Sequence, residues 1–319
     1  MKARDPIVPG NTLDRTGAQG VLRRALAQLR RRQLRAVREA QSAFDAVPVV
    51  GTVVRNDPVG SRFTLYAGRP DVIERVMTLL TEALQRYYVG ETGGWRGHWF
   101  AEFTEDAARL GTTQSHANLS HLSPTYEATR RMSDVLFSEP FRNRVAAAQI
   151  KSYEHWSGMA GADRGQLADA VSRSIADGLN PRQAKKLIAE KLQTSLSKAE
   201  GYAQTDITDA LRTARVAERD WAAQNLGMNI GLLWKSALIP TTRQTHAARN
   251  GQVYDSAEVA DFYSRDGNIY RCHCSITECL LDDEGRPLLS ARAIETSKTE
   301  LARWRAANAA KLRKKRASS

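Results

Sequence analysis

The spacing of apolar side chains predicts that the first two-thirds of the chain are mainly helical. Apolar residues recur every three to four positions over residues 21–44 and again over 71–88, which is the period of an amphipathic helix. Between these segments, residues 45–69 hold short β-branched runs broken by proline and glycine, which predict a hairpin or an extended clamp. Residues 1–20 are rich in Pro, Gly and Thr, and we expect them to form a mobile arm.

Helix-ending residues divide the middle of the chain. Residues 104–160 predict helices that are interrupted at two prolines, and a further helix follows them. Gly178 suits a helix C-terminus, and Asn180-Pro181 supplies a capping side chain followed by proline at the first helical position. Residues 195–197 predict a new cap, after which a long helix runs to a closing glycine, Gly227.

The pattern changes after residue 231, where short strands replace the long helices. Residues 232–234, 251–254 and 269–276 predict strands, a short helix holds His246, and residues 290–315 predict a final amphipathic helix. The fold class is therefore α+β, with a mainly helical N-terminal two-thirds and a small mixed α/β C-terminal module. We expect four parts: a mobile basic arm and helix (1–60), a helical domain (61–163), the C-terminal module with its preceding helices (164–289), and a basic helix and tail (290–319).

Positive charge is concentrated near the two ends of the chain. The net charge is +12 over 319 residues, and two clusters without acids account for it, so the middle of the chain is nearly neutral. Such clusters attract polyanions, above all nucleic acid, because binding releases condensed counterions. The alternative is that they only keep the protein soluble. The candidate DNA-binding residues are Arg23, Arg24, Arg30, Arg31, Arg32, Arg35, Arg38, Lys311, Arg313, Lys314, Lys315 and Arg316.

The cysteines indicate a reducing compartment. All three lie between residues 272 and 279, so they cannot pair completely, and the two that are one residue apart would form a strained disulfide. The N-terminus leads into no apolar segment of signal-peptide length. No run approaches the roughly 20 apolar residues that span a bilayer. We therefore expect a protein of the cytoplasm without a membrane anchor.

His246, Cys272 and Cys274 form a candidate zinc site. Thiolates and imidazole suit zinc, and a small module gains folding energy from a bound metal. In a strand, Cys272 and Cys274 would share one face while His273 would point the opposite way. The fourth ligand would be His273, Cys279 or a nearby carboxylate. The alternative is that the cysteines simply pack in a reduced core. No other cofactor is expected.

The same segment gives little support for catalysis. A cysteine nucleophile paired with His246 would need an orienting group such as Asn250 or Asp255, and no protease signature surrounds either cysteine. A metal-dependent nuclease would need carboxylates converging on the metal, and the segment holds only scattered acids. Phosphate-binding glycine loops, dinucleotide fingerprints and zinc-protease helices do not occur. We therefore expect no enzymatic activity.

An ordered set of motifs spans about residues 164–282. A Thr-acid pair in the long helix is followed by a tryptophan strand, a Thr-Arg segment leading to histidine, a glycine turn and a Cys-x-Cys strand. The residues concerned are Thr205, Asp206, Trp234, Thr242, Arg243, His246 and Gly251, followed by Cys272-His273-Cys274. This order resembles the phage Mu F-like minor head proteins, also called the head morphogenesis family. The chain departs from the family pattern at Gln204 and His273, where arginine is usual, and at residues 239–241, where an aspartate is expected. These departures bear on the ion-pair network of the family and leave its fold in place.

The resemblance implies a virion component present in few copies near the portal. Such a protein acts in head assembly and in handling the packaged genome, with no catalytic activity, and residues 164–289 would form its Mu F-like domain. Its expected partners are phage portal, capsid and scaffold proteins and double-stranded DNA. Its expected location is the capsid interior or the portal vertex, after assembly in the cytoplasm of a bacterial host. The alternatives are a metal-dependent nuclease acting on DNA and a nucleic-acid-binding regulator, although helix-turn-helix and zinc-finger spacings are absent from the sequence.

Overall fold

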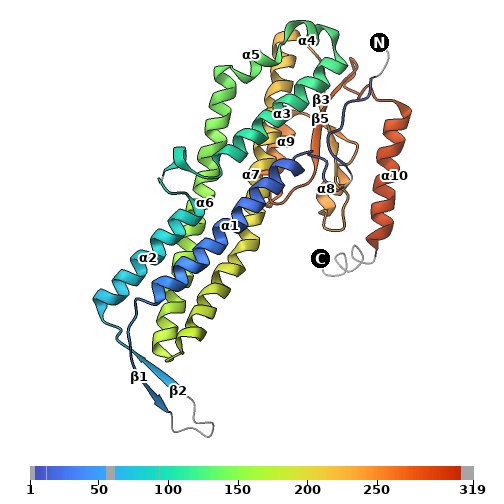
Figure 1. Ribbon diagram of the computed structural model, residues 1–319. Coiled ribbons are helices and arrows are strands. Elements are labelled where there is room, and N and C mark those ends of the chain that lie inside the picture. The colour runs from blue at the N-terminus through green and yellow to red at the C-terminus, as the bar shows by residue number, and fades with distance from the viewer. Residues whose placement is uncertain (1–3, 12, 55–61, 93, 310–319) are drawn as a thin grey trace. The chain divides into compact units, whose positions relative to one another are not determined.

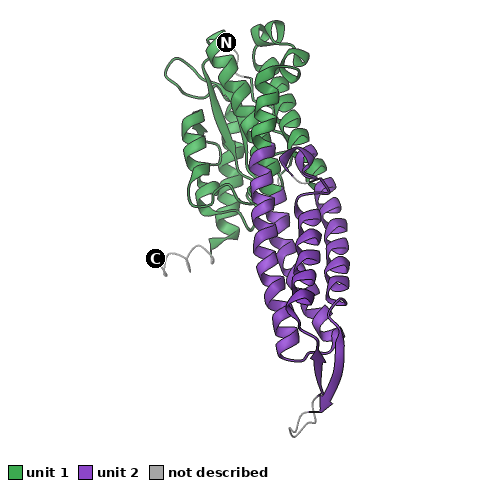
Figure 2. Ribbon diagram, turned by 90° about the vertical axis from the view of Figure 1, so that its left-hand side faces the viewer, with its two compact units in different colours: residues 1–22, 103–148, 204–319 green, residues 23–102, 149–203 purple. Residues whose placement is uncertain are grey.

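The computed structural model describes residues 4–11, 13–54, 62–92 and 94–309 (Figure 1). Helices make up most of these residues, and a small antiparallel sheet lies in the C-terminal part, which confirms the predicted α+β class. Contacts divide the chain into two compact units (Figure 2). Unit 1 holds residues 1–22, 103–148 and 204–319, and unit 2 holds residues 23–102 and 149–203. The units do not follow the four consecutive parts expected from the sequence, because several long helices supply residues to both.

Unit 2 contains the whole of one long helix, parts of three others, and a hairpin. The helices are α1 (Gln19–Phe44), α2 (Pro70–Tyr88), α6 (Glu139–Ala176) and α7 (Pro181–Leu226), and a short 3-10 turn, η1, covers Trp95–Gly97. The strands β1 (Val49–Val54) and β2 (Arg62–Tyr66) pair antiparallel, which confirms the hairpin. The core of this unit is aromatic. Trp156 is fully buried, and its ring lies 5.2 Å from that of Trp99 and 5.1 Å from that of Phe100.

Two of the predicted helix breaks are wrong. The helix α6 is continuous over 38 residues and α7 over 46 residues, although the sequence predicts a boundary near residue 164 and a new cap at residues 195–197. The Ser195 hydroxyl does not cap a helix but donates to a buried carboxylate, Asp163 Oδ1, at 2.8 Å. The end at Gly178 is confirmed, since its φ is +61°. Asn180 caps α7 as predicted, because its Oδ1 accepts from the Gln183 N–H at 3.0 Å.

Unit 1 is built around a three-stranded antiparallel sheet with the strand order β4-β3-β5. The strands are β3 (Ile230–Lys235), β4 (Val253–Tyr254) and β5 (Ser275–Leu280). Two short helices, α8 (Gln244–Ala248) and α9 (Ser256–Ser264), lie in the connections between strands. One face of the sheet packs Leu232, Trp234 and Ile276 against apolar residues of α9 and against Val216 of α7. On the other face, Lys235 contacts Ser297 and Glu300 of α10 (Ala291–Ala307).

The interruption that the sequence predicts at the first of the two prolines is confirmed, because α3 (Ala101–Leu122) ends just before α4 (Pro124–Thr129) begins. The short helix α5 (Met132–Leu136) follows, and α6 begins at Glu139, next to the second proline. The helix α9 was not predicted, although the sequence carries its start signal. Asp255 accepts from the Glu258 N–H, and the Glu258 side chain accepts from the Asp255 N–H. This reciprocal capping box fixes the first turn.

The N-terminal segment differs from the mobile arm that we expected. The Ile7 N–H donates to Asn118 Oδ1 at 2.7 Å, and the Arg15 N–H donates to the His273 carbonyl at 3.1 Å. Asp14 and Thr16 are buried, and their side chains hydrogen bond each other at 2.6 Å. The described part of this segment is therefore packed in unit 1, because its polar groups find partners there.

Candidate metal centre and family signature

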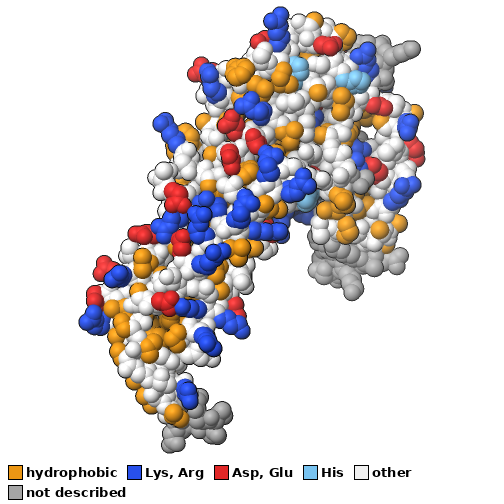
Figure 3. Space-filling model, viewed as in Figure 1, with side chains coloured by type: hydrophobic (Ala, Val, Ile, Leu, Met, Phe, Trp, Pro, Cys, Tyr) orange, Lys and Arg blue, Asp and Glu red, His pale blue; other side chains and the backbone are white. Residues whose placement is uncertain are grey.

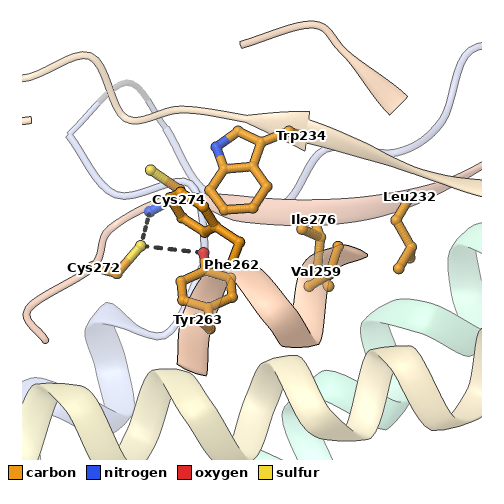
Figure 4. Close-up of a cluster of buried hydrophobic side chains, with 8 residues drawn as sticks. All are labelled: Leu232, Trp234, Val259, Phe262, Tyr263, Cys272, Cys274 and Ile276. Carbon is orange, nitrogen blue, oxygen red and sulfur yellow. Dashed lines mark hydrogen bonds between the residues drawn. The ribbon is translucent and has the colours of Figure 1, made fainter. Parts of the chain in front are cut away.

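The structure brings His246, Cys272 and Cys274 together in unit 1. Their ligand atoms lie within 4.8 Å of one another, and all three residues are buried. His246 Nδ1 lies 3.5 Å from Cys272 Sγ and 3.6 Å from Cys274 Sγ. Figure 4 shows both sulfur atoms beside the aromatic cluster of the sheet, with dashed lines from Cys272 Sγ to the Tyr263 hydroxyl and to the backbone nitrogen of Cys274. The three candidate ligands therefore lie beside one another, and metal binding by them stays a prediction.

Hydrogen bonds made by Ser236, the residue after β3, fix the position of His246. The Ser236 hydroxyl donates to the His246 carbonyl at 2.6 Å, and the Ser236 N–H donates to Asn250 Oδ1 at 2.9 Å. The Asn250 amide donates in turn to the Ser297 carbonyl of α10 at 2.9 Å. These buried bonds hold the middle of the five-residue helix α8 and the residue Asn250 that follows it, so the imidazole has a defined position.

Arg243 and Thr205 hold the loop that leads to the cysteines. The Arg243 guanidinium donates to the carbonyls of Gly267, Asn268 and Tyr270 at 2.6–3.0 Å. Thr205 Oγ1, on α7, accepts from the Arg271 N–H at 3.1 Å. Arg271 has a positive φ of 49°, a conformation that side chains adopt only when the surroundings enforce it. Two residues of the sequence motif therefore shape the segment that presents Cys272.

The other motif residues support the sheet. Trp234 is fully buried, and its ring stacks on Tyr263 at 5.3 Å and meets the edge of Phe262 at 5.1 Å. Gly251 has a φ of +80°, and its N–H donates to the Trp234 carbonyl at 2.8 Å. A Cβ at Gly251 would meet Ser297 Cβ at 2.7 Å, so only glycine fits there without strain. Asp206 is buried on α7, and Thr242 is half-buried in the turn before α8.

The two cysteines of the cluster have opposite shifts in pKa. Burial raises the pKa of Cys272, but hydrogen bonds with Cys274 and His246 and the charges of His246 and Arg212 outweigh it, so this pKa lies well below the usual thiol value. The hydrogen bond with Cys272 raises the pKa of Cys274 well above that value, and burial adds to the effect. The opposite directions follow from the closeness of the two sulfur atoms, since each thiol affects the charge of the other. Cysteine binds metals as the thiolate, so these contacts concern the form that a metal would need.

The candidate fourth ligands lie elsewhere. His273 points away from the cluster, and its Nε2 lies 2.8 Å from Gln204 Nε2 on α7. Cys279 of β5 pairs with Gly231 of β3, and its side chain lies on the face of the sheet opposite to that of Ile276. The strand predicted over 269–276 begins only at Ser275, yet side chains still alternate before it. Within the described residues, no carboxylate joins the cluster.

A buried ion pair beside the sheet was missed by sequence reasoning. Arg215 of α7 and Glu278 of β5 are both fully buried, with Arg215 Nη2 2.7 Å from Glu278 Oε2. The Glu278 carboxylate also accepts from Ser115 Oγ and Asn118 Nδ2 of α3, each at 2.8 Å. The only signal in the sequence is a glutamate within an otherwise uncharged strand, which needs a partner when the strand is buried.

The arginines of α1 differ in exposure to solvent and in their contacts. Six of the seven candidates are exposed, namely Arg23, Arg24, Arg30, Arg31, Arg35 and Arg38. Arg32 is half-buried, donates to the carbonyls of Tyr87 and Arg86, and lies 5.0 Å from the ring of Trp99. It packs within unit 2, since its guanidinium donates to the carbonyls at the end of α2, so it offers less of its charge to a ligand than the exposed arginines do. Figure 3 shows Lys and Arg side chains along α1 with Asp and Glu among them. The candidates at 311–316 lie outside the described residues.

Comparison with known proteins identifies the C-terminal part of the chain. Residues 165–277 match the family model described as Phage Mu protein F like protein, which confirms the resemblance. The match covers about a third of the chain and includes the motif residues from Thr205 to Cys274. No curated protein and no solved structure gives a significant match. Within the described part of the chain, no helix is long and apolar enough to cross a membrane.

Proposed function

We propose, from the match of residues 165–277 to the phage Mu F-like family, that this chain is a minor head protein of a tailed phage. It is present in few copies near the portal, contacts portal, capsid or scaffold proteins, and binds or helps deliver packaged DNA. The observation that carries the proposal is that the matched motif residues converge in one module. Thr205, Arg243 and Trp234 each brace the segment around the sheet, which is what a structural domain requires.

The particle itself provides the test of a head role. Particles made by the phage that encodes this chain should contain it at a small fraction of the abundance of the major capsid protein. Quantitative mass spectrometry of purified particles measures that ratio. A chain that is expressed in the host but absent from full and empty heads would refute the proposal.

DNA binding is proposed through the exposed arginines of α1. Arg30 and Arg35 pair with Glu200 and Glu91 at 2.9 and 3.6 Å, which reduces the charge they offer to a phosphate. Arg23, Arg31 and Arg38 are exposed as well and lie on the same helix. Because phosphate neutralisation releases counterions, each contact adds about −0.9 to the slope of log affinity against log salt.

Charge-matched variants test that surface. Replacing Arg23, Arg31 and Arg38 together with alanine should lower affinity for duplex DNA and reduce the salt slope by as much as about 2.7. The control replaces Arg69, Arg173 and Lys186, which are also exposed, lie elsewhere in unit 2 and carry the same total charge. Equal effects of the two triple variants would mean that α1 is not a DNA-binding surface. Removal of residues 310–319 tests the C-terminal cluster in the same assay.

We further propose that the chain has no nuclease activity. Nucleases that use two metals hold them with hard oxygen ligands, whereas the cluster at His246 offers two sulfurs and one nitrogen inside the core. Supercoiled DNA incubated with the protein and magnesium, manganese or zinc should therefore remain uncut. Nicking that depends on metal and disappears in His246→Ala would establish the nuclease instead.

A further inference from the structure

The contacts of His246 with the two sulfur atoms are difficult to explain by hydrogen bonding alone. One imidazole nitrogen carries either one hydrogen or one lone pair, so it makes one hydrogen bond. Yet Nδ1 lies at almost the same distance, 3.5 and 3.6 Å, from Cys272 Sγ and Cys274 Sγ. A single hydrogen bond accounts for one of these contacts and leaves the other unexplained.

Tetrahedral zinc coordination accounts for both contacts. Zinc binds sulfur at about 2.3 Å and histidine nitrogen at about 2.05 Å, so a regular tetrahedron separates such a nitrogen and sulfur by about 3.6 Å. Both observed separations agree with this edge length. We propose that His246 Nδ1, Cys272 Sγ and Cys274 Sγ bind one zinc ion.

The surroundings of the sulfur atoms suit thiolate ligands. Cys272 Sγ accepts from the Cys274 N–H at 3.4 Å and lies 3.3 Å from the Tyr263 hydroxyl. Arg212, whose guanidinium lies 3.5 Å from the centre of the Tyr263 ring, adds a positive charge nearby. Such outer contacts orient ligands and stabilise their charged form. Two thiolates and one imidazole favour zinc over magnesium, calcium or manganese, which prefer oxygen.

The metal would connect two segments that are distant in the sequence. His246 belongs to α8, whereas the cysteines belong to the loop that enters β5. Zinc therefore joins the β3–β4 connection to the start of β5, and it stabilises the module that carries the family motif. With Nδ1 bound to zinc, His246 Nε2 carries the proton. Nε2 is buried without a hydrogen-bond partner among the described residues, and the Phe262 ring centre is 4.9 Å from that of the imidazole. Within the described part of the chain, no fourth histidine, cysteine or carboxylate joins these three ligands.

Elemental analysis of the full chain tests the site. Protein purified without chelator and without an immobilised-metal column should contain about one zinc per chain. His246→Ala, Cys272→Ala and Cys274→Ala should each lose most of that zinc. Cys279→Ala is the matched control, because Cys279 is equally buried in unit 1 but lies on the other face of β5. It should keep its zinc.

A second measurement covers variants that fail to fold. Wild-type protein stripped of metal and titrated with cobalt should develop thiolate-to-cobalt charge-transfer absorption that saturates at one equivalent, and zinc should remove it. The site is refuted if the wild-type chain contains no zinc and binds neither metal, or if Cys279→Ala loses zinc while Cys274→Ala keeps it. The assay uses the isolated chain, so its result does not depend on the proposed role in a phage head.

Discussion

The buried ion pair between Arg215 and Glu278 allows a quantitative test of how α7 is fastened to the sheet. Arg215→Met would remove the cation and leave the Glu278 carboxylate with Ser115 and Asn118 as its donors. Because neither member of the pair is exposed, water cannot replace the lost charge. Removing one partner of such a pair costs about 3–5 kcal/mol. Glu278→Gln should cost a similar amount, since it leaves the guanidinium near Gln114 Oε1, at 3.1 Å, without a counterion.

The double variant separates charge compensation from simple loss of packing. When Met replaces Arg215 and Gln replaces Glu278 together, no buried charge remains unpaired. The combined cost should therefore fall short of the sum of the single costs by at least about 2 kcal/mol. Hydrogen exchange followed by mass spectrometry, on peptides from β3 and β5, measures the opening free energy of this sheet without assuming that the whole chain unfolds in one step.

An exposed ion pair of similar geometry provides the control. Arg286 Nε lies 2.8 Å from Asp282 Oδ2, but the arginine side chain is 71% exposed. Arg286→Met should cost no more than about 1 kcal/mol. If Arg215→Met costs as little as Arg286→Met, or if the double variant equals the sum of the single variants, the buried charges are not what holds β5 to α7.

Two further predictions concern residues around α10. Gly251→Ala should destabilise unit 1 by about 1–3 kcal/mol in thermal unfolding, because the added Cβ meets Ser297 at a positive φ. Gly227→Ala is its control, with a similar φ of +60° but no atom within 4 Å, and it should cost only about 1–2 kcal/mol. Burial raises the pKa of Glu300, but the charges of Lys235 and Arg15 outweigh burial and lower it. The carboxylate therefore adds stability above its unfolded pKa of about 4.3, and this stability is lost as pH falls through the lower folded value. Glu300→Gln should cost about 1–2 kcal/mol at pH 7 and progressively less below about pH 4. A constant difference in unfolding free energy from pH 7 to pH 3 would contradict that assignment.

Local signals in the sequence were sufficient to predict helix ends that depend only on neighbouring residues. The end at Gly178 and the cap at Asn180 are set by a positive φ and a local hydrogen bond, so both could be predicted. The breaks expected near residue 164 and at 195–197 failed for a different reason. Ser195 donates to Asp163, which is distant in the sequence, and this tertiary contact replaces the capping role that the residue type suggested.

The buried stripe of α1 is made largely of small residues. It includes Ala25, Ala36 and Ala40 with Leu29, whereas Leu34 is 55% exposed. Small residues allow neighbouring helices to approach closely, so a stripe of alanines can face the core although its hydrophobicity is modest. A pattern of large aliphatic residues therefore identifies a helix more reliably than it identifies the buried face.

The sequence was sufficient to predict the candidate ligands of the site, but not the residues that hold the surrounding segments in place. Cys272 and Cys274 are separated by one residue, and any extended backbone places them on one side. The carbonyls bound by Arg243 and the pairing of Arg215 with Glu278 depend on how distant segments meet. Residue type and spacing do not show which distant segments come into contact, so these contacts appear only in the structure.

Two of the three departures from the family pattern, Gln204 and His273, contact each other. The family usually has arginine at the positions of Gln204 and His273, and here their side-chain nitrogens lie 2.8 Å apart. Two cations at that separation would repel unless an acid lay between them, whereas an amide nitrogen can donate to an imidazole nitrogen. The His273 carbonyl accepts from the Arg15 N–H, so this residue connects α7 and the N-terminal segment to the loop that carries Cys272 and Cys274. The three consecutive side chains of Cys272, His273 and Cys274 therefore make contacts on two different sides of the chain. Cys272 and Cys274 face His246, and His273 fastens their backbone from the other side.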